Sequence, residues 1–128
     1  MKTSMKRSDG KMIILDTNFI IYSVINKINI VETVREKLPD TVPVVTDSVI
    51  QELEGLSHSK SEAAVGLRLV RNFPKVTSTR NGDDGILEAS LKYGLPVITN
   101  DRKLSSLLRN NHIRVYSLRD RRYLEVRK

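Results

Sequence analysis

The stretch Met12–Ile20, which reads MIILDTNFI, limits the possible folds of this chain more than any other segment. Its apolar residues form one short unbroken block, as expected of a strand that is buried on both faces of a parallel sheet. The block ends abruptly at Asp16, at the carboxyl end of the expected strand. Ligands of open α/β sheets bind beside this end of the strands, so Asp16 is placed for chemistry. The competing interpretation is that Asp16 or Thr17 only caps a following helix.

The same pattern returns at Pro96–Thr99, a second strand of the buried type that is followed at once by Asn100 and Asp101. Further strands are expected at Val42–Thr46, Val76–Thr79 and Ile113–Tyr116, with Tyr123–Val126 as an additional edge strand. Apolar residues at helical spacing predict helices at Phe19–Ile25, Ile30–Leu38, Val49–Leu56, Ala63–Phe73, from Asp83 to Gly94, and around Leu104–Leu108. This alternation predicts a three-layer α/β/α sandwich with a central, mostly parallel sheet of four to five strands.

The composition suits one compact domain, since the chain has 128 residues and 39% of them are hydrophobic. We expect this domain to cover residues 11–128, behind a basic N-terminal tail at residues 1–10. A net charge of +7 favours a polyanion such as RNA or DNA as the partner. The absence of Cys excludes disulfides, thiolate metal sites and cysteine nucleophiles. No apolar run is long enough for a membrane span, and we expect a cytoplasmic protein.

Four acidic residues occupy comparable places in the predicted fold: Asp16 and Asp101 after strands, Glu52 at the edge of a helix's apolar stripe, and Asp84 at a helix start. Parallel strands place their carboxyl ends on one edge of the sheet, so these side chains are expected to approach one another. Clustered carboxylates repel each other unless a divalent cation neutralises them, and oxygen-only ligands suit Mg²⁺ or Mn²⁺. The alternative is that Asp84 and Asp101 are ordinary helix caps.

From Lys11 to about Leu118, the chain resembles PIN domains, small α/β/α nucleases related to the flap-endonuclease type. The resemblance rests on LDTN at Leu15–Asn18, VIQELEGL at Val49–Leu56, DDGILEA at Asp83–Ala89 and TNDRKL at Thr99–Leu104. The order and spacing of these motifs are more specific than each motif alone. Stand-alone archaeal and ribosome-processing PIN proteins are the most similar branch.

The resemblance implies that one or two Mg²⁺ or Mn²⁺ ions are bound by the four acids, with a metal-activated water hydrolysing phosphodiester bonds in single-stranded RNA. Asp83, beside the matching Asp84, is a secondary candidate. Thr17, Asn18, Thr99 and Asn100 match the polar residues that support the ligands. His58 and His112 are too isolated to form a ligand pair.

Basic residues near the expected site are candidates for RNA contact: Lys60, Arg80, Arg102 and Lys103. A second basic group ends the chain, at Arg119, Arg121, Arg122, Arg127 and Lys128. We expect the first group, rather than the second, to contact RNA. The small number of aromatic residues argues against a base-stacking platform like that of RNA-recognition modules.

Several alternatives stay open at this point. Within nucleases, the chain is either an RNA-maturation enzyme or the toxin ribonuclease of a toxin–antitoxin pair, with an antitoxin or an RNA-processing factor as its partner. From another class, it is a catalytically silent RNA-binding or scaffold PIN domain. A phosphoacceptor α/β domain is disfavoured, because Thr17 and Asn18 follow Asp16 where such domains need a second Asp. A homodimer through the apolar segment Phe19–Ile25 competes with burial of that segment in the core.

Overall fold

The computed structural model describes residues 11–127, so the expected basic tail at residues 1–10 and Lys128 lie outside the described part. Its strands are β1 (Met12–Leu15), β2 (Val42–Thr46), β3 (Lys75–Val76), β4 (Val97–Ile98), β5 (Val115–Arg119) and β6 (Tyr123–Val126). Its helices are α1 (Thr17–Ile25), α2 (Ile30–Lys37), α3 (Asp47–Leu56), α4 (Ser61–Val70), α5 (Gly82–Tyr93) and α6 (Arg102–Asn110). The predicted order of strands and helices is confirmed.

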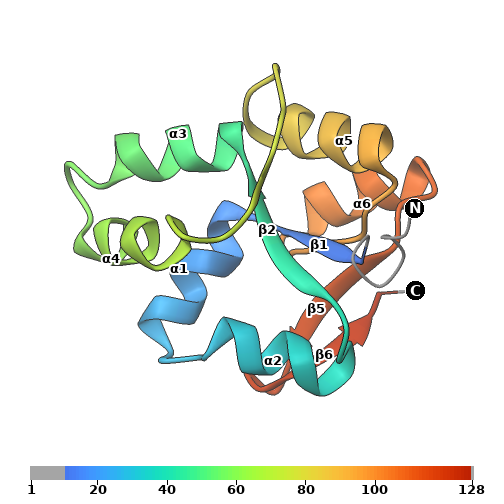
Figure 1. Cartoon of the computed structure of the whole chain (residues 1–128), viewed down its shortest axis with the longest axis horizontal. Coiled ribbons are helices and arrows are strands. Elements are labelled where there is room, and N and C mark those ends of the chain that lie inside the picture. The colour runs from blue at the N-terminus through green and yellow to red at the C-terminus, as the bar shows by residue number, and fades with distance from the viewer. Residues whose placement is uncertain (1–10, 128) are drawn as a thin grey trace, which may run out of the picture.

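The strands form one sheet in the order β3-β2-β1-β4-β5-β6. All neighbouring pairs are parallel except β5 and β6, which form an antiparallel hairpin. Helix α2 packs on β2 and β6, whereas α5 and α6 pack on β2 and β5, and α1, α3 and α4 pack on one another (Figure 1). The α/β fold class with a mostly parallel central sheet is therefore confirmed.

Strand β1 lies at the centre of the core. Ile13, Ile14 and Leu15 have no exposed surface, as expected for a strand covered on both faces. Phe19 and Ile20 on α1 are also buried, so they belong to the core, while Ile25 at the end of that helix keeps 58% of its surface exposed. Core burial therefore accounts for most of the apolar segment that was considered for a dimer contact.

Helix ends follow the expected local chemistry in several places. Asn29 accepts a hydrogen bond from the Glu32 amide and caps α2, and Thr46 caps α3 by accepting from the Val49 amide. Gly94 ends α5 in the left-handed conformation, with φ of 67°, which glycine adopts without a steric penalty. Before α4, a Ser59 or Ser61 cap would be expected from the sequence, but Lys60 occupies the cap position and makes no side-chain cap bond.

Some details of the sheet differ from the prediction. The sheet has six strands rather than four to five, because Tyr123–Val126 pairs with β5 through a tight turn at Arg119–Arg122. β4 covers Val97–Ile98 instead of Pro96–Thr99, and β5 covers Val115–Arg119 instead of Ile113–Tyr116. β3 stops at Val76 instead of Thr79, because the amides beyond it bond to side chains of other elements: Ser78 donates to Asp47 and Thr79 to Glu88.

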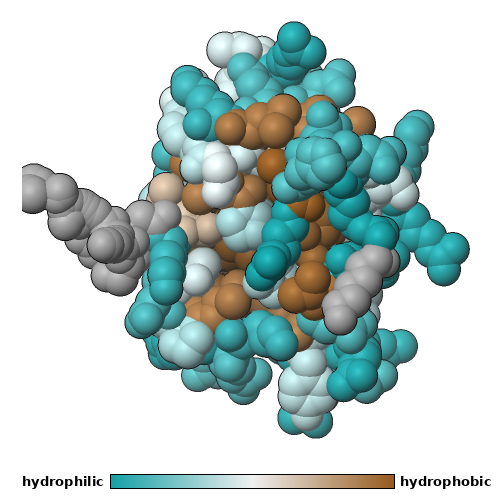
Figure 2. Space-filling model, turned by 90° about the vertical axis from the view of Figure 1, so that its right-hand side faces the viewer, coloured by the Kyte–Doolittle hydropathy of each residue, from teal (hydrophilic) through white to brown (hydrophobic). Residues whose placement is uncertain are grey.

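The surface is mixed in character. On the side that carries α5, α6 and the ends of the described chain, hydrophilic side chains surround separate apolar patches (Figure 2). In residues 11–127, no helix combines the length and the apolar character needed to span a membrane.

Candidate active site

Asp16 and Asp101 follow two strands that are direct neighbours. β1 and β4 pair in parallel, with Leu15 opposite Ile98, and the Asp16 amide donates to the Ile98 carbonyl oxygen at 3.1 Å. The residues that follow these two strands therefore meet at the carboxyl edge of the sheet, as the crossover rule predicts.

The Asp16 side chain is buried, with 5% of the residue exposed, and its Oδ2 accepts a hydrogen bond from Thr99 Oγ1 at 2.8 Å. It makes no cap bond to α1, so the interpretation of Asp16 as a cap alone is wrong. The pKa of Asp16 is raised to about 6, mainly because burial disfavours the charged form; the negative charges of Asp83, Asp101 and Glu52 also raise it, and the Thr99 hydrogen bond partly opposes the shift. Such a shift is typical of functional sites.

Thr99 joins Asp16 to the start of α6. Its Oγ1 donates a hydrogen bond to Asp16 and also accepts one from the Asp101 amide at 3.0 Å. The residue is fully buried. Asp101 caps α6, since its Oδ1 accepts from the amides of Lys103 and Leu104 at 2.8 and 3.2 Å. The cap interpretation of Asp101 is thus confirmed, but it commits only one of the two carboxylate oxygens.

Two other predicted support residues lie in this edge. Asn100 lies against β5, where its Oδ1 accepts a hydrogen bond from the Leu118 amide at 3.0 Å. Asn18 is exposed on the first turn of α1. Asn100 therefore ties the loop after β4 to the next strand.

Glu52 reaches this edge from α3. Thr17 Oγ1, at the first position of α1, donates to Glu52 Oε1 at 2.8 Å. Glu52 is exposed, although its place beside the apolar stripe predicted partial burial. Thr17 therefore links the third acid to the helix that begins immediately after Asp16.

Of the two adjacent acids at the start of α5, Asp83 interacts electrostatically with the other three. Its pKa is raised by desolvation and by the charges of Asp101, Glu52 and the neighbouring Asp84, whereas Lys103 lowers it, and its own charge raises the pKa of Asp16. Asp84 instead lines a shallow pocket with Arg80, Leu87, Glu88 and Leu91. The structure thus brings Asp83 together with the other three acids, whereas the sequence analysis ranked Asp84 first.

Helical periodicity distinguishes the positions of Asp83 and Asp84 on α5. Asp83 precedes the buried residues Ile86 and Ser90 by three and seven positions, so it shares their inward face. Asp84 has the same spacing to Leu87, which is half-buried, and to Leu91, which is exposed. The orientation of α5 is set by Gly85, where an added Cβ would lie 2.6 Å from Ser48 Oγ on α3.

The charges of Glu52 and Asp101 raise the pKa of both Asp16 and Asp83, but the four acids do not enclose a common point. Within residues 11–127, no three carboxylate or imidazole groups are close enough together to surround a metal ion. The donor set nevertheless consists of carboxylate oxygens, which hard divalent ions prefer. Asp16, Glu52 and Asp101 are held by hydrogen bonds, whereas Asp83 is exposed on the first turn of α5.

The candidate RNA-contact residues are not all in one place. Arg102 and Lys103 are exposed on the first turn of α6, and Lys103 acts on Asp83. Arg80 is in the loop before α5, beside Asp84. Lys60 is on the α3–α4 connection, at the end of α3 remote from α5 (Figure 1). His58 and His112 are both exposed.

The sequence and the fold are similar to those of known proteins. A family model described as PIN like domain matches residues 13–121. The chain is 35% identical to ribonuclease VapC9 of Archaeoglobus fulgidus over 84% of this chain and 82% of that protein. It is 36% identical to ribonuclease VapC4 of Methanocaldococcus jannaschii over 89% and 95%, respectively. The PIN domain endonuclease Utp24 matches with a TM-score of 0.78 and 28% identity, over 90% of each chain.

Proposed function

The chain belongs to the family of PIN-like domains, and on that premise we propose that it is a divalent-metal-dependent endoribonuclease that hydrolyses phosphodiester bonds in single-stranded RNA. Two relatives that match nearly the whole chain are named ribonucleases, and a similar solved structure is described as an endonuclease. These names support the class of reaction, and the substrate and the metal requirement are part of the proposal.

The observation that carries the proposal is a buried carboxylate, Asp16, which lies at one edge of the sheet within the negative field of three other acids. The charges of Glu52, Asp83 and Asp101 all oppose ionisation of the buried Asp16. A divalent cation would offset this repulsion, because it favours the ionised form of every carboxylate around it. We assign Asp16, Glu52, Asp83 and Asp101 to its binding, with Asp83 in the place that the sequence analysis gave to Asp84.

When bound, Mg²⁺ or Mn²⁺ supplies an activated water and charge stabilisation at the phosphate. The chain's own residues hold the ligands for that task. Thr99 orients Asp16 and the Asp101 backbone, and Thr17 holds Glu52. Supporting hydrogen bonds of this kind orient ligand carboxylates and are typical of metal sites. Arg102 and Lys103 bring positive charge to the rim, which attracts the RNA backbone to an otherwise acidic site.

The experiment that tests the proposal is cleavage of a labelled single-stranded RNA with Mn²⁺, Mg²⁺ or EDTA. Wild type is expected to cut only with a divalent ion, and Asp16→Asn and Asp83→Asn are expected to abolish cutting. Asp84→Asn is the matched control, because it removes the same charge from the next position of the same helix. Cleavage that survives EDTA would reject the metal requirement, and loss in Asp84→Asn alone would reject the assignment of Asp83.

The alternative within nucleases is a toxin ribonuclease that an antitoxin inhibits. The two VapC relatives favour this role, which predicts growth arrest on expression of wild type and none with Asp16→Asn. A maturation nuclease would leave growth unaffected. A catalytically silent binding domain would bind RNA with no cleavage under any ion.

A further inference from the structure

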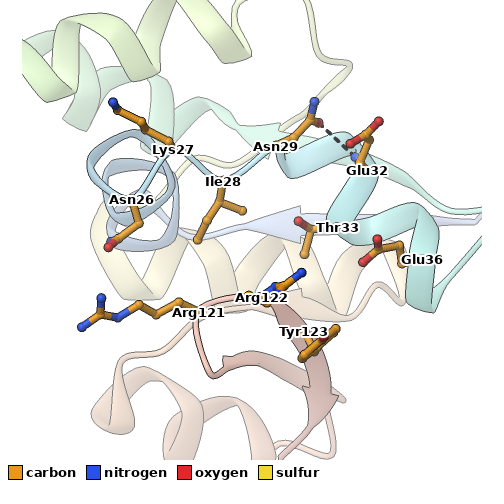
Figure 3. A pocket seen from close by; sticks show the side chains of 10 residues that line it. All are labelled: Asn26, Lys27, Ile28, Asn29, Glu32, Thr33, Glu36, Arg121, Arg122 and Tyr123. Atoms are coloured by element: carbon orange, nitrogen blue, oxygen red, sulfur yellow. Dashed lines mark hydrogen bonds between the residues drawn. The ribbon is translucent and has the colours of Figure 1, made fainter.

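A cleft of about 390 Å³ lies between the loop that joins α1 to α2 and the turn that joins β5 to β6. Figure 3 shows its two sides, with Ile28, Thr33 and Glu36 on one and Arg122 and Tyr123 on the other. The volume is within the range of small-molecule sites, which is roughly 300–1,000 Å³. None of the four acids lines this cleft.

Two segments of the chain lead from the candidate active site to the cleft. Helix α1 begins immediately after Asp16 and ends at the cleft, and nine helical residues span about 14 Å. The β5–β6 turn begins one residue after Leu118, which Asn100 holds beside Asp101. A single RNA strand that crosses the acidic site therefore has the cleft within a few nucleotides.

Thr33 on α2 is the first sign that the cleft receives a ligand. Its side chain lines the cleft, and the residue is 8% exposed. Within residues 11–127, the only buried side-chain oxygen without a hydrogen bond is that of Ser105, so the Thr33 hydroxyl is not shut off from the cleft. A ligand that enters the cleft can therefore hydrogen-bond to this hydroxyl, which both donates and accepts.

The charges around the cleft are the second sign. In the described part of the chain, the ion pairs at the hairpin both use Arg119, so Arg121 and Arg122 keep unpaired charges. Arg122 extends beneath α2, whereas Arg121 and Lys27 point outwards at the mouth (Figure 3). Arg122 and Glu36 thus offer a donor and an acceptor inside, and Lys27 and Arg121 offer positive charge outside.

Tyr123 adds an aromatic surface. It keeps 48% of its surface exposed, and the Arg122 guanidinium lies over its ring at 5.5 Å from the centroid. Unpaired RNA bases stack on aromatic rings and on guanidinium planes, and their polar edges hydrogen-bond to neighbouring side chains. The cleft therefore combines stacking, hydrogen-bonding and phosphate-binding groups.

We propose that this cleft binds one nucleotide of the single-stranded RNA substrate at a position away from the bond that is cut. The base lies against Tyr123 and Arg122 with its polar edge toward Thr33 and Glu36, and the adjoining phosphates lie near Lys27 and Arg121. This inference rests on the proposed function. It assigns RNA contact to the C-terminal basic group, which the sequence analysis ranked second.

The test measures equilibrium binding of a labelled single-stranded RNA in Mg²⁺, with every variant carrying Asp16→Asn so that the RNA stays intact. Arg122→Ala and Tyr123→Ala are expected to weaken binding about tenfold each. Arg121→Gly is expected to lower the slope of log K against log salt by about 0.7, the value for one lost phosphate contact. Glycine suits this position, because Arg121 has φ of 60°.

Thr33→Val separates binding from folding. Valine keeps the shape and removes the hydroxyl, so the melting temperature should stay equal or rise while RNA affinity falls about threefold or more. The matched charge control is Arg114→Ala, because Arg114 is exposed and precedes β5, at the end of that strand opposite to the cleft. This control should change affinity by less than about twofold.

The outcomes separate this proposal from the proposed function. If wild type cuts RNA but all cleft variants bind it like the Arg114→Ala control, the cleft proposal is overturned and the nuclease stands. If a free mononucleotide fills the cleft as tightly as the RNA does, the cleft is a nucleotide pocket and the substrate assignment is overturned. If wild type neither cuts nor binds single-stranded RNA, both proposals fail.

Discussion

Thr99 Oγ1 donates a hydrogen bond to Asp16 Oδ2 at 2.8 Å, although the two residues are 83 positions apart in the chain. The contact exists because β1 and β4 are neighbours in the sheet and both end at the same edge. It orients a buried carboxylate that also experiences the charges of three other acids. The following predictions depend on this arrangement.

The buried Asp16 should make the metal-free protein less stable as the pH rises. The folded state holds the Asp16 proton up to a pKa of about 6, and the ordinary value is 3.8, so the folded state binds more protons between these values. Stability is therefore lost as the pH rises from about 4 to about 6, by up to about 3 kcal/mol. Asp16→Asn has no such titration, and it should be more stable than wild type above pH 6.

Denaturant unfolding in EDTA between pH 4 and pH 8 measures this effect. The difference in free energy of unfolding between wild type and Asp16→Asn isolates the contribution of Asp16 from that of other groups. Parallel pH profiles for the two proteins would contradict the prediction.

Divalent ions should stabilise wild type in a pH-dependent way. Protons and a cation compete for the same carboxylates, so Mn²⁺ should raise the melting temperature at pH 7.5 more than at pH 5.5. Calorimetric titration at both pH values gives the affinities directly. Asp84→Asn should bind Mn²⁺ as tightly as wild type does. If Mn²⁺ left the melting temperature of wild type unchanged, this result would argue against the metal site.

Removal of the Thr99 hydroxyl should impair the site more than the fold. Thr99→Val leaves the Asp101 amide without its acceptor, at a cost of about 1–3 kcal/mol in stability. It also removes the hydrogen bond that lowers the pKa of Asp16, so the pH dependence of cleavage should shift upward. Activity should fall about 10- to 100-fold. Thr99→Ser restores the hydroxyl, and failure of this variant to recover activity and pH profile would refute the role.

Gly85→Ala should push α5 away from α3. The added Cβ would lie 2.3 Å from the Arg80 carbonyl oxygen and 2.6 Å from Ser48 Oγ, so the helices must separate. We expect a loss of about 1–3 kcal/mol in stability and weaker cleavage, because Asp83 moves with α5. Gly55→Ala is the matched control, since no atom lies within 4 Å of its added Cβ.

Thermal unfolding and cleavage rates check both glycine variants. Gly55→Ala should be neutral or stabilising by up to about 1 kcal/mol, because alanine favours the helix. If Gly85→Ala and Gly55→Ala had equal melting temperatures and cleavage rates, the close approach of α5 to α3 would not be what positions Asp83.

Local sequence patterns are enough to predict the secondary structure and the kinds of residue at the sheet edge. Apolar blocks and helical spacing depend on residues close together in the chain, so the order of strands and helices was predictable. Asp16 and Asp101 could be placed for the same reason, since Asp16 directly follows β1 and Asp101 lies three residues after the end of β4.

Only the tertiary structure decided which side chains face each other. The choice between Asp83 and Asp84 depends on the rotation of α5, which Gly85 sets through its contact with Ser48 on another helix. The hydrogen bond from Thr17 to Glu52 and the cleft between α2 and the β5–β6 turn likewise join residues far apart in sequence. Local patterns carry little information about such contacts, because they depend on distances between packed elements.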